Sequence, residues 1–90
     1  MKVDILGKKE DLRRMQQAVN LFQRAGEINK IKLEINMTHN FSAFAGHSFN
    51  ASKTPIIFIN GQIEFTGIDL DLKVIQKKII QLRDKGSELF

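Results

Sequence analysis

Alternating apolar and polar positions predict two β-strands in the first half of the chain. In residues 2–6, Val3 and Ile5 share one face, and Gly7 ends the pattern. In residues 30–37, every second side chain is apolar and those between them are charged or polar, so one face is expected to be buried. The inward positions are Ile31, Leu33, Ile35 and Met37. Because lysines occupy the outer face, this second strand is predicted to lie at a sheet edge.

The second half of the chain carries the pattern of a β-hairpin. Residues 56–59 are continuously apolar, as in a strand covered on both faces, and Pro55 precedes them where no ladder hydrogen bond is lost. Residues 62–66 alternate between polar and apolar side chains. The dipeptide Asn60-Gly61 between these strands is a strong signal for a type I′ turn. The two strands are therefore predicted to pair with each other.

Two longer segments show the three- and four-residue spacing of amphipathic helices. Residues 8–25 form the first, with Gly26 as its expected C-cap. Residues 70–83 form the second, capped by Asp69, and residues 84–90 are expected to fray. The apolar positions of these stripes are Leu12, Met15, Ala18, Val19 and Phe22 in the first helix and Leu72, Ile75, Ile79 and Leu82 in the second.

Residues 38–53, between the second and third strands, follow no regular period. They favour one short helix, capped by Thr38 or Asn40, followed by a polar loop. The spacing of His39 and His47 matches neither a helical metal pair nor a base beside a nucleophile, so both are interpreted as polar loop residues. The aromatic side chains predicted to join the core are Phe41, Phe44 and Phe49.

The elements follow the order βαβαββα, which predicts an α/β fold. Helices separate the first three strands, so the first pair is expected to be parallel with a right-handed crossover, and the closing hairpin completes a four-stranded mixed sheet. Helices are expected on both faces of the sheet. A chain of 90 residues provides one hydrophobic core, so residues 1–90 are predicted to form a single domain.

Composition narrows the classes of function. The chain has no cysteine, which excludes disulfides, dithiol redox chemistry and cysteine-ligated metals. No apolar run is long enough to span a bilayer and none opens the chain as a signal segment, so a cytoplasmic protein without membrane contact is expected. The net charge of +4 comes from scattered side chains, and Tyr and Trp are absent, so nucleic-acid binding is not expected. No cofactor is predicted.

Two short motifs connect this order of elements to a known superfamily. Residues 3–7 form a first strand that ends in Ile-Leu-Gly, and Thr54-Pro55 opens the third strand. With these motifs and the element order of residues 2–83, the chain resembles the thioredoxin and glutaredoxin superfamily, and within it the small redox-active disulfide proteins. The resemblance implies a thioredoxin-like fold with the strand order 2-1-3-4, in which the Thr54-Pro55 bond is cis and faces the start of the first helix.

The redox motif of that superfamily is missing. Its Cys-x-x-Cys would stand at the start of the first helix, where an ungapped alignment places Glu10 and Arg13. If the apolar stripe of the helix is aligned instead, Lys9 and Leu12 take those positions. None of these side chains supplies the thiolate that disulfide exchange requires, so thiol oxidoreductase activity is excluded. We therefore expect a domain that is not an enzyme.

Two features near the helix starts leave ligand binding open. Residues 67–69, Gly-Ile-Asp, resemble the segment by which glutaredoxins hold the amino end of glutathione, although an Asp before a helix is more often an N-cap. Four basic residues surround the start of the first helix, where free amides and the helix dipole favour an anion such as phosphate or carboxylate: Lys8, Lys9, Arg13 and Arg14. In the alternative, Glu10 and Asp11 of the same turn satisfy those amides.

These patterns predict a protein- or peptide-binding module without thiol chemistry, and the alternative is a small-anion or glutathione-binding domain. The binding surface is expected around the start of the first helix, the proline and the loop at residues 46–53. The candidate residues are Lys8, Lys9, Leu12, Ser52, Thr54, Pro55, Gly67 and Asp69. A monomer and a homodimer are both compatible with the sequence.

Overall fold

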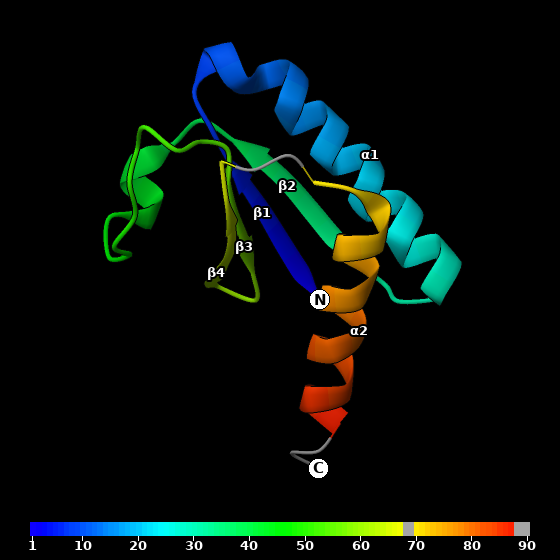
Figure 1. Cartoon of the computed structure of the whole chain (residues 1–90). Helices are drawn as coiled ribbons and strands as arrows, with labels where there is room; N and C mark the ends of the chain where they lie inside the picture. The colour runs from blue at the N-terminus through cyan, green and yellow to red at the C-terminus, as the bar shows by residue number, and fades with distance from the viewer. Residues whose placement is uncertain (68–69, 88–90) are drawn as a thin grey trace.

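The computed structural model describes residues 1–67 and 70–87, which form a four-stranded mixed β-sheet, two α-helices and two short 3₁₀ helices (Figure 1). The strands are β1 (Lys2–Leu6), β2 (Glu34–Thr38), β3 (Ile56–Ile59) and β4 (Gln62–Thr66). The helices are η1 (Lys9–Asp11), α1 (Leu12–Asn29), η2 (Phe41–Phe44) and α2 (Leu72–Ser87). The predicted cap Asp69 lies outside the described residues. The predicted α/β class is confirmed.

The sheet has the strand order β2-β1-β3-β4, as predicted. β1 pairs in parallel with β2 and antiparallel with β3, and β3 pairs antiparallel with β4. Asn60 and Gly61 form the turn of the hairpin, and both have the positive φ that a type I′ turn requires. This turn is fastened to β1, because the Asn60 N–H donates to the Lys2 carbonyl (2.8 Å) and the Asn60 side-chain oxygen accepts from the Lys2 N–H (3.0 Å).

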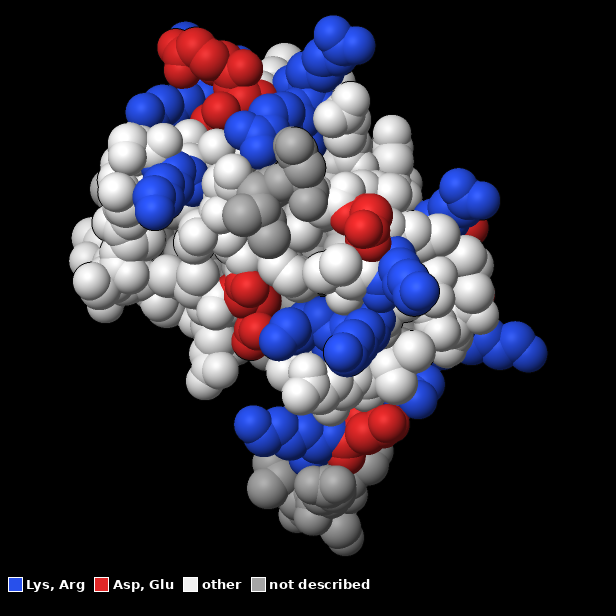
Figure 2. Space-filling model, in the orientation of Figure 1, with Lys and Arg blue, Asp and Glu red and all other residues white. Residues whose placement is uncertain are grey.

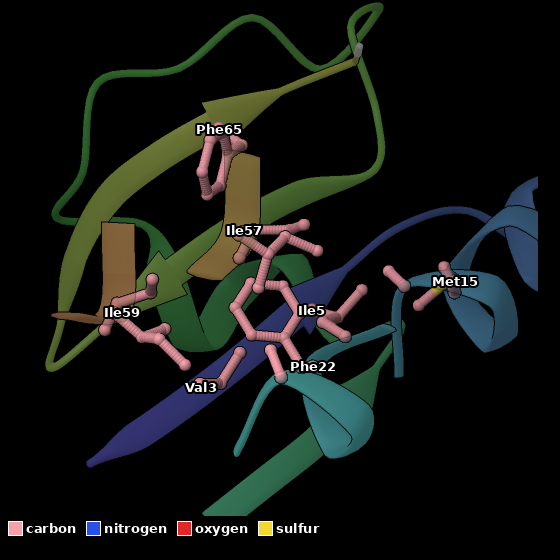
Figure 3. Close-up of a cluster of buried hydrophobic side chains, with 11 residues drawn as sticks. Val3, Ile5, Met15, Phe22, Ile57, Ile59 and Phe65 are labelled. Carbon is pink, nitrogen blue, oxygen red and sulfur yellow. The ribbon is translucent and has the colours of Figure 1, made fainter. Parts of the chain in front are cut away.

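Both α-helices lie on one face of the sheet, where they enclose the larger hydrophobic cluster (Figure 1). Figure 3 shows the Phe22 ring of α1 among the side chains of Val3, Ile5 and Ile57. The buried members of this cluster are Val3, Ile5, Met15, Ala18, Phe22, Ala25, Ile57, Ile59, Phe65, Ile75 and Ile79. These positions recur at every second residue of a strand and every third or fourth residue of a helix, which is the periodicity that the sequence predicts.

The opposite face of the sheet is covered by η2 and the loop that follows it. A second buried cluster on this face consists of Leu6, Ile56 and Phe58. The half-buried aromatic side chains that pack on it are Phe41, Phe44 and Phe49. The Phe44 ring stacks on the Phe58 ring, with 4.4 Å between their centroids. Asn40 is the N-cap residue of η2, without a side-chain hydrogen bond to the helix backbone. The prediction of helices on both faces is therefore not confirmed for the α-helices, because this face carries only the short 3₁₀ helix η2 among the described residues.

The sequence predicts Gly26 as the C-cap of the first helix, and this prediction is wrong. α1 continues to Asn29, and Lys30 follows it in the left-handed conformation. A Cβ on Gly26 would lie 2.9 Å from the Ile31 carbonyl oxygen. The chain folds back at once, and the Ile31 N–H donates to the Gly26 carbonyl at 2.9 Å. Gly26 therefore permits the close approach of the returning chain, which is a different use of glycine from a left-handed cap.

Other predicted positions also change. β2 begins at Glu34, so the alternating residues 30–37 span a loop as well as a strand. Met37, predicted to face inward, is 40% exposed because β2 is an edge strand with no neighbour on its outer side among the described residues. Leu12, predicted within the buried stripe, is 41% exposed because it is the first residue of α1. α2 continues through Ser87, into the tail predicted to fray.

Candidate functional site

A groove of about 520 Å³ opens between α1 and the β3–β4 hairpin, on the face that the helices cover. From the hairpin and the segment after it, the groove is lined by Pro55, Ile57, Phe65, Gly67 and Leu70. From α1 it is lined by Arg14, Gln17, Ala18, Asn20, Leu21 and Arg24. Positions 14, 17, 21 and 24 form one flank of the helix at the three- and four-residue spacing. Because Ile57 and Phe65 are buried, the floor of the groove is apolar.

The α1 wall of the groove is polar and positively charged. Gln17 and Asn20 are exposed near its middle, and Arg14 and Arg24 stand at its two ends. Arg14 reaches the opposite wall, where its guanidinium donates to the Gly67 carbonyl at 3.4 Å. Among the described residues, no acidic side chain lines the groove. In Figure 2, basic side chains gather around the N-terminal end of α1, with acidic ones among them, and over α2.

The Thr54-Pro55 segment connects the groove to the start of the first helix. Its peptide bond is cis, as the resemblance implies. Thr54 is buried, and its hydroxyl donates to the Asp11 carboxylate at 2.5 Å. The same carboxylate oxygen accepts the Lys8 backbone N–H at 2.9 Å. Asp11 therefore satisfies the Lys8 amide at the helix start. The sequence left open whether an external anion or an acidic side chain of this turn would do so.

These contacts hold the pKa of Asp11 below its ordinary value. The hydrogen bond from Thr54 is the largest cause; desolvation by burial opposes it, while the Lys8 amide and the positive charge of Arg14 lower the pKa further. The carboxylate is therefore ionised at neutral pH and acts as a hydrogen-bond acceptor. Asp11 is the residue that contacts Thr54, and neither alignment with the Cys-x-x-Cys motif singles it out.

Gly67 brings the end of β4 close to the proline segment. Its φ is 55°, and a Cβ at this position would lie 2.9 Å from the Lys53 carbonyl oxygen. Its N–H donates to the Pro55 carbonyl at 2.9 Å. A side chain would collide with the backbone, so glycine is required here for both reasons. The described role of Gly67 is thus structural, and the predicted pairing with Asp69 lies outside the described residues.

The structure brings together only part of the predicted binding surface. Pro55 and Gly67 line the groove, whereas the buried Thr54 contacts Asp11. The predicted residues that are exposed outside the groove are Lys8, Lys9, Leu12 and Ser52. Ser52 belongs to a local turn, since its N–H donates to the side-chain oxygen of Asn50 at 2.9 Å.

Sequence reasoning missed the flank of α1 that forms one wall of the groove. The sequence pattern places Gln17, Asn20 and Arg24 on the polar face opposite the apolar stripe, where contact with solvent is expected. The available signal was Leu21, an apolar residue one turn after Gln17 and one turn before Arg24. Such a mixed stripe beside the buried stripe is the pattern of a helix that faces a core on one side and a groove on the other.

The side chains of both histidines make contacts within the fold. The His39 Nδ1–H donates to the Gly7 carbonyl at 2.8 Å, and the His47 ring meets the Phe58 ring edge-on with 5.0 Å between centroids. Within residues 1–67 and 70–87, no three potential metal-ligating side chains come together. In the same part of the chain, no helix is both long and apolar enough to cross a membrane.

Similarity to known proteins does not assign a function to this chain. No family model, no curated protein and no solved structure matches this chain. The groove, with its apolar floor and polar α1 wall, is the feature from which a function can be argued.

Proposed function

We propose that this chain is a non-catalytic, thioredoxin-like domain that binds an extended peptide segment of a partner protein in the groove beside Pro55. The observation that carries the proposal is the combination of an apolar floor at Ile57 and Phe65 with polar side chains along the α1 wall. Apolar burial provides affinity and a few polar groups provide orientation in the usual binding site. Because the chain has no cysteine, the ligand is held by non-covalent contacts and not through a disulfide.

Gln17 and Asn20 favour a peptide over a purely apolar ligand. Each exposed amide offers both donors and an acceptor, as does each residue of an extended backbone. Side chains three residues apart on a helix are separated by about 5–6 Å, which is close to the advance of about 6.7 Å over two residues of an extended chain. A backbone that runs along α1 would therefore pair with both amides while one of its side chains enters the apolar floor.

The thioredoxin-like part of the proposal is supported by three features of the chain. The strand order β2-β1-β3-β4 agrees with the order that the resemblance implies. The Thr54-Pro55 segment directly precedes β3, and the hydrogen bond from the Thr54 hydroxyl to Asp11 holds this segment at the start of the first helix. These features support a thioredoxin-like scaffold without the redox motif, and binding without redox chemistry is the function that such a scaffold can still perform.

A small-anion or glutathione site at the start of the first helix is the weaker candidate. The Asp11 carboxylate already accepts the Lys8 amide at 2.9 Å and places a negative charge where the anion would bind. We expect the melting temperature to stay constant in millimolar phosphate, nucleotide or glutathione. Stabilisation by about 2.7 kcal/mol, the value for a ligand at a hundredfold excess over its Kd, would favour the anion site instead.

A single substitution can block the groove, and the neighbouring residue offers a matched control. Gln17→Trp places a large ring among the lining residues, whereas Gln16→Trp places the same ring at an exposed position that does not line the groove. Short random peptides displayed on phage are selected on the wild-type chain, and their affinities are measured by fluorescence polarisation. We expect Gln17→Trp to weaken binding about tenfold or more and Gln16→Trp to leave it unchanged.

Two results would overturn the proposal. The first is a selection in which no peptide is enriched over a blank surface. The second is a set of enriched peptides that bind Gln17→Trp as tightly as Gln16→Trp, because their site would then lie elsewhere. Thermal unfolding of both variants verifies that each keeps the wild-type fold, since both positions are exposed.

A further inference from the structure

The two arginines at the ends of the α1 wall differ in their partners, and this difference indicates which class of ligand the groove binds. At one end of the α1 wall, Arg14 donates to the Gly67 carbonyl, and its charge acts on the Asp11 carboxylate. At the other end, Arg24 is exposed, and neither a hydrogen bond nor an ion pair joins it to any described residue. No carboxylate lines the groove among these residues. Arg24 is therefore the cation at the groove that lacks an anionic partner within residues 1–67 and 70–87.

Within the described part of the chain, the acidic residue of α1 does not form an ion pair with Arg24. Glu27 is the one acidic residue in the sequence of α1, and it follows Arg24 by three positions. It lines a second hollow together with Lys30 and Lys32, and it does not line the groove beside Pro55. No ion pair between Arg24 and Glu27 occurs among the described residues. The guanidinium is thus left to interact with a ligand or with water.

We propose that the groove selects peptides that carry an Asp or Glu close to the apolar side chain bound on its floor, and that Arg24 determines this specificity. The inference rests on the proposed function of the groove. Leu21 and Arg24 both line the groove. They are three residues apart on α1, so their Cβ atoms are separated by about 5–6 Å. An extended peptide advances about 3.3 Å per residue. The acidic residue of the ligand therefore lies one or two residues from the apolar anchor.

The chemistry of the two groups agrees with this assignment. A guanidinium can donate two parallel hydrogen bonds to a carboxylate, which fixes the orientation of the ligand as well as its charge. A free phosphate would also match the charge of Arg24, but it would leave the apolar floor at Ile57 and Phe65 unfilled. An apolar side chain next to a carboxylate satisfies both parts of the groove, so an acidic peptide is the ligand class that the geometry favours.

Two pools of fluorescently labelled peptides test this inference. Each pool has a central leucine and randomised Gly, Ser and Ala elsewhere, with a glutamate two positions from the leucine in one pool and a glutamine in the other. The wild-type chain is expected to bind the glutamate pool about fivefold more tightly at low salt, with a smaller preference at high salt. Arg24→Gln is expected to remove this preference. Arg13→Gln, at an exposed position of the same helix that does not line the groove, is expected to keep it.

A reversal of charge provides a second test. Arg24→Glu is expected to bind a pool with lysine in place of glutamate more tightly than the wild-type chain does. Equal affinity of the wild-type chain for the glutamate and glutamine pools, or a preference that survives in Arg24→Gln, would overturn the acidic-ligand inference and leave groove binding in place. If the wild-type chain binds neither pool, the proposed function fails as well, and the two failures are therefore distinguishable.

Discussion

The two faces of the β-sheet are covered in different ways. On one face, α1 and α2 bury large side chains completely, and Phe22 lies at the centre of that cluster. On the other face, η2 and its loop place half-buried aromatic rings over Phe58. Each arrangement excludes water from one side of the same strands. The first relies on long periodic segments, whereas the second relies on the size and stacking of a few rings.

The candidate site lies on the helix-covered face, and the comparison explains why. A long helix can present one stripe to the core and the adjacent stripe to a groove, as α1 does with Phe22 and Gln17. On the other face, the polar groups of the loop bond to one another: the Ser42 hydroxyl donates to Asn40, and the Ser52 hydroxyl donates to Asn50. The helix-covered face therefore supplies both a rigid support and free polar side chains for a ligand.

Phe22→Ala should have the largest effect, because it removes the ring at the centre of the helix-covered face. Truncation of a fully buried phenylalanine costs about 3–5 kcal/mol of unfolding free energy. Denaturant unfolding followed by circular dichroism measures this loss. Gln16→Ala, on the exposed side of the same helix, is the control and should change stability by less than about 0.5 kcal/mol. A loss under about 2 kcal/mol for Phe22→Ala would contradict the central role of this cluster.

Gly67→Ala should be the next most damaging change, because it separates the hairpin from the proline segment. The methyl group would meet the Lys53 carbonyl oxygen at 2.9 Å while the backbone stays at a φ of 55°. We expect a loss of about 2–3 kcal/mol and weaker peptide binding, since Gly67 lines the groove. The matched control is Gly61→Ala, which has a positive φ but no atom near its added Cβ, and it should lose only about 1 kcal/mol.

Phe44→Ala tests the loop-covered face. Phe44 stacks on Phe58 but is only half-buried, so we expect a loss of about 1–2 kcal/mol. Hydrogen exchange should accelerate in residues 41–53 more than in α1, because the ring holds the loop and not the helices. If this variant loses as much stability as Phe22→Ala, the two faces contribute equally and the contrast between them is wrong.

Asp11→Asn should have the smallest effect, and that effect should depend on pH. Folding lowers the pKa of Asp11, so its carboxylate stabilises the native state at pH values above the pKa of this group in the unfolded chain. This contribution is lost as the pH falls through the lower pKa of the folded state. We expect the free energy of unfolding to fall by about 1 kcal/mol at neutral pH. This is less than for a hydrogen bond to a fully buried carboxylate, because Asp11 is half-exposed and solvent screens its charge.

Unfolding curves at several pH values measure this dependence. The difference between the wild-type chain and Asp11→Asn should narrow below about pH 4, where the carboxyl groups become protonated. Glu10→Gln, on the exposed acidic neighbour, is the control and should change stability little at any pH. A difference that stays constant from neutral to acidic pH would contradict the role of the ionised carboxylate.

Much of the sheet could be predicted because its signals are local. The bounds of β1, β3 and β4 agree with the predicted strands, since alternation, the continuous apolar run and Asn60-Gly61 each act within a few residues. The prediction failed where a local pattern has two meanings. Gly26 is typical of a helix end, but here it admits the returning chain. Met37 follows the alternation, but an edge strand leaves it exposed.

The candidate site was predicted less completely, because it combines residues from separate parts of the chain. Pro55 and Gly67 were predicted from motifs, and both line the groove. The α1 wall was not predicted, because its polar residues resemble a solvent face in the sequence. Asp11 was assigned only to the helix start, although its carboxylate also accepts the Thr54 hydroxyl across a separation of 43 residues.

The sequence by itself determined the class of elements, their order, the pairing of the hairpin and the exclusion of thiol chemistry. These follow from side-chain periodicity, turn preferences and the absence of cysteine, which are all properties of neighbouring residues or of composition. The groove, the contact between Asp11 and Thr54 and the position of Arg24 beside an apolar floor were decided only by the tertiary structure. The reason is that packing of α1 against the sheet sets which flank of the helix faces solvent and which faces a groove, and that packing depends on distant residues.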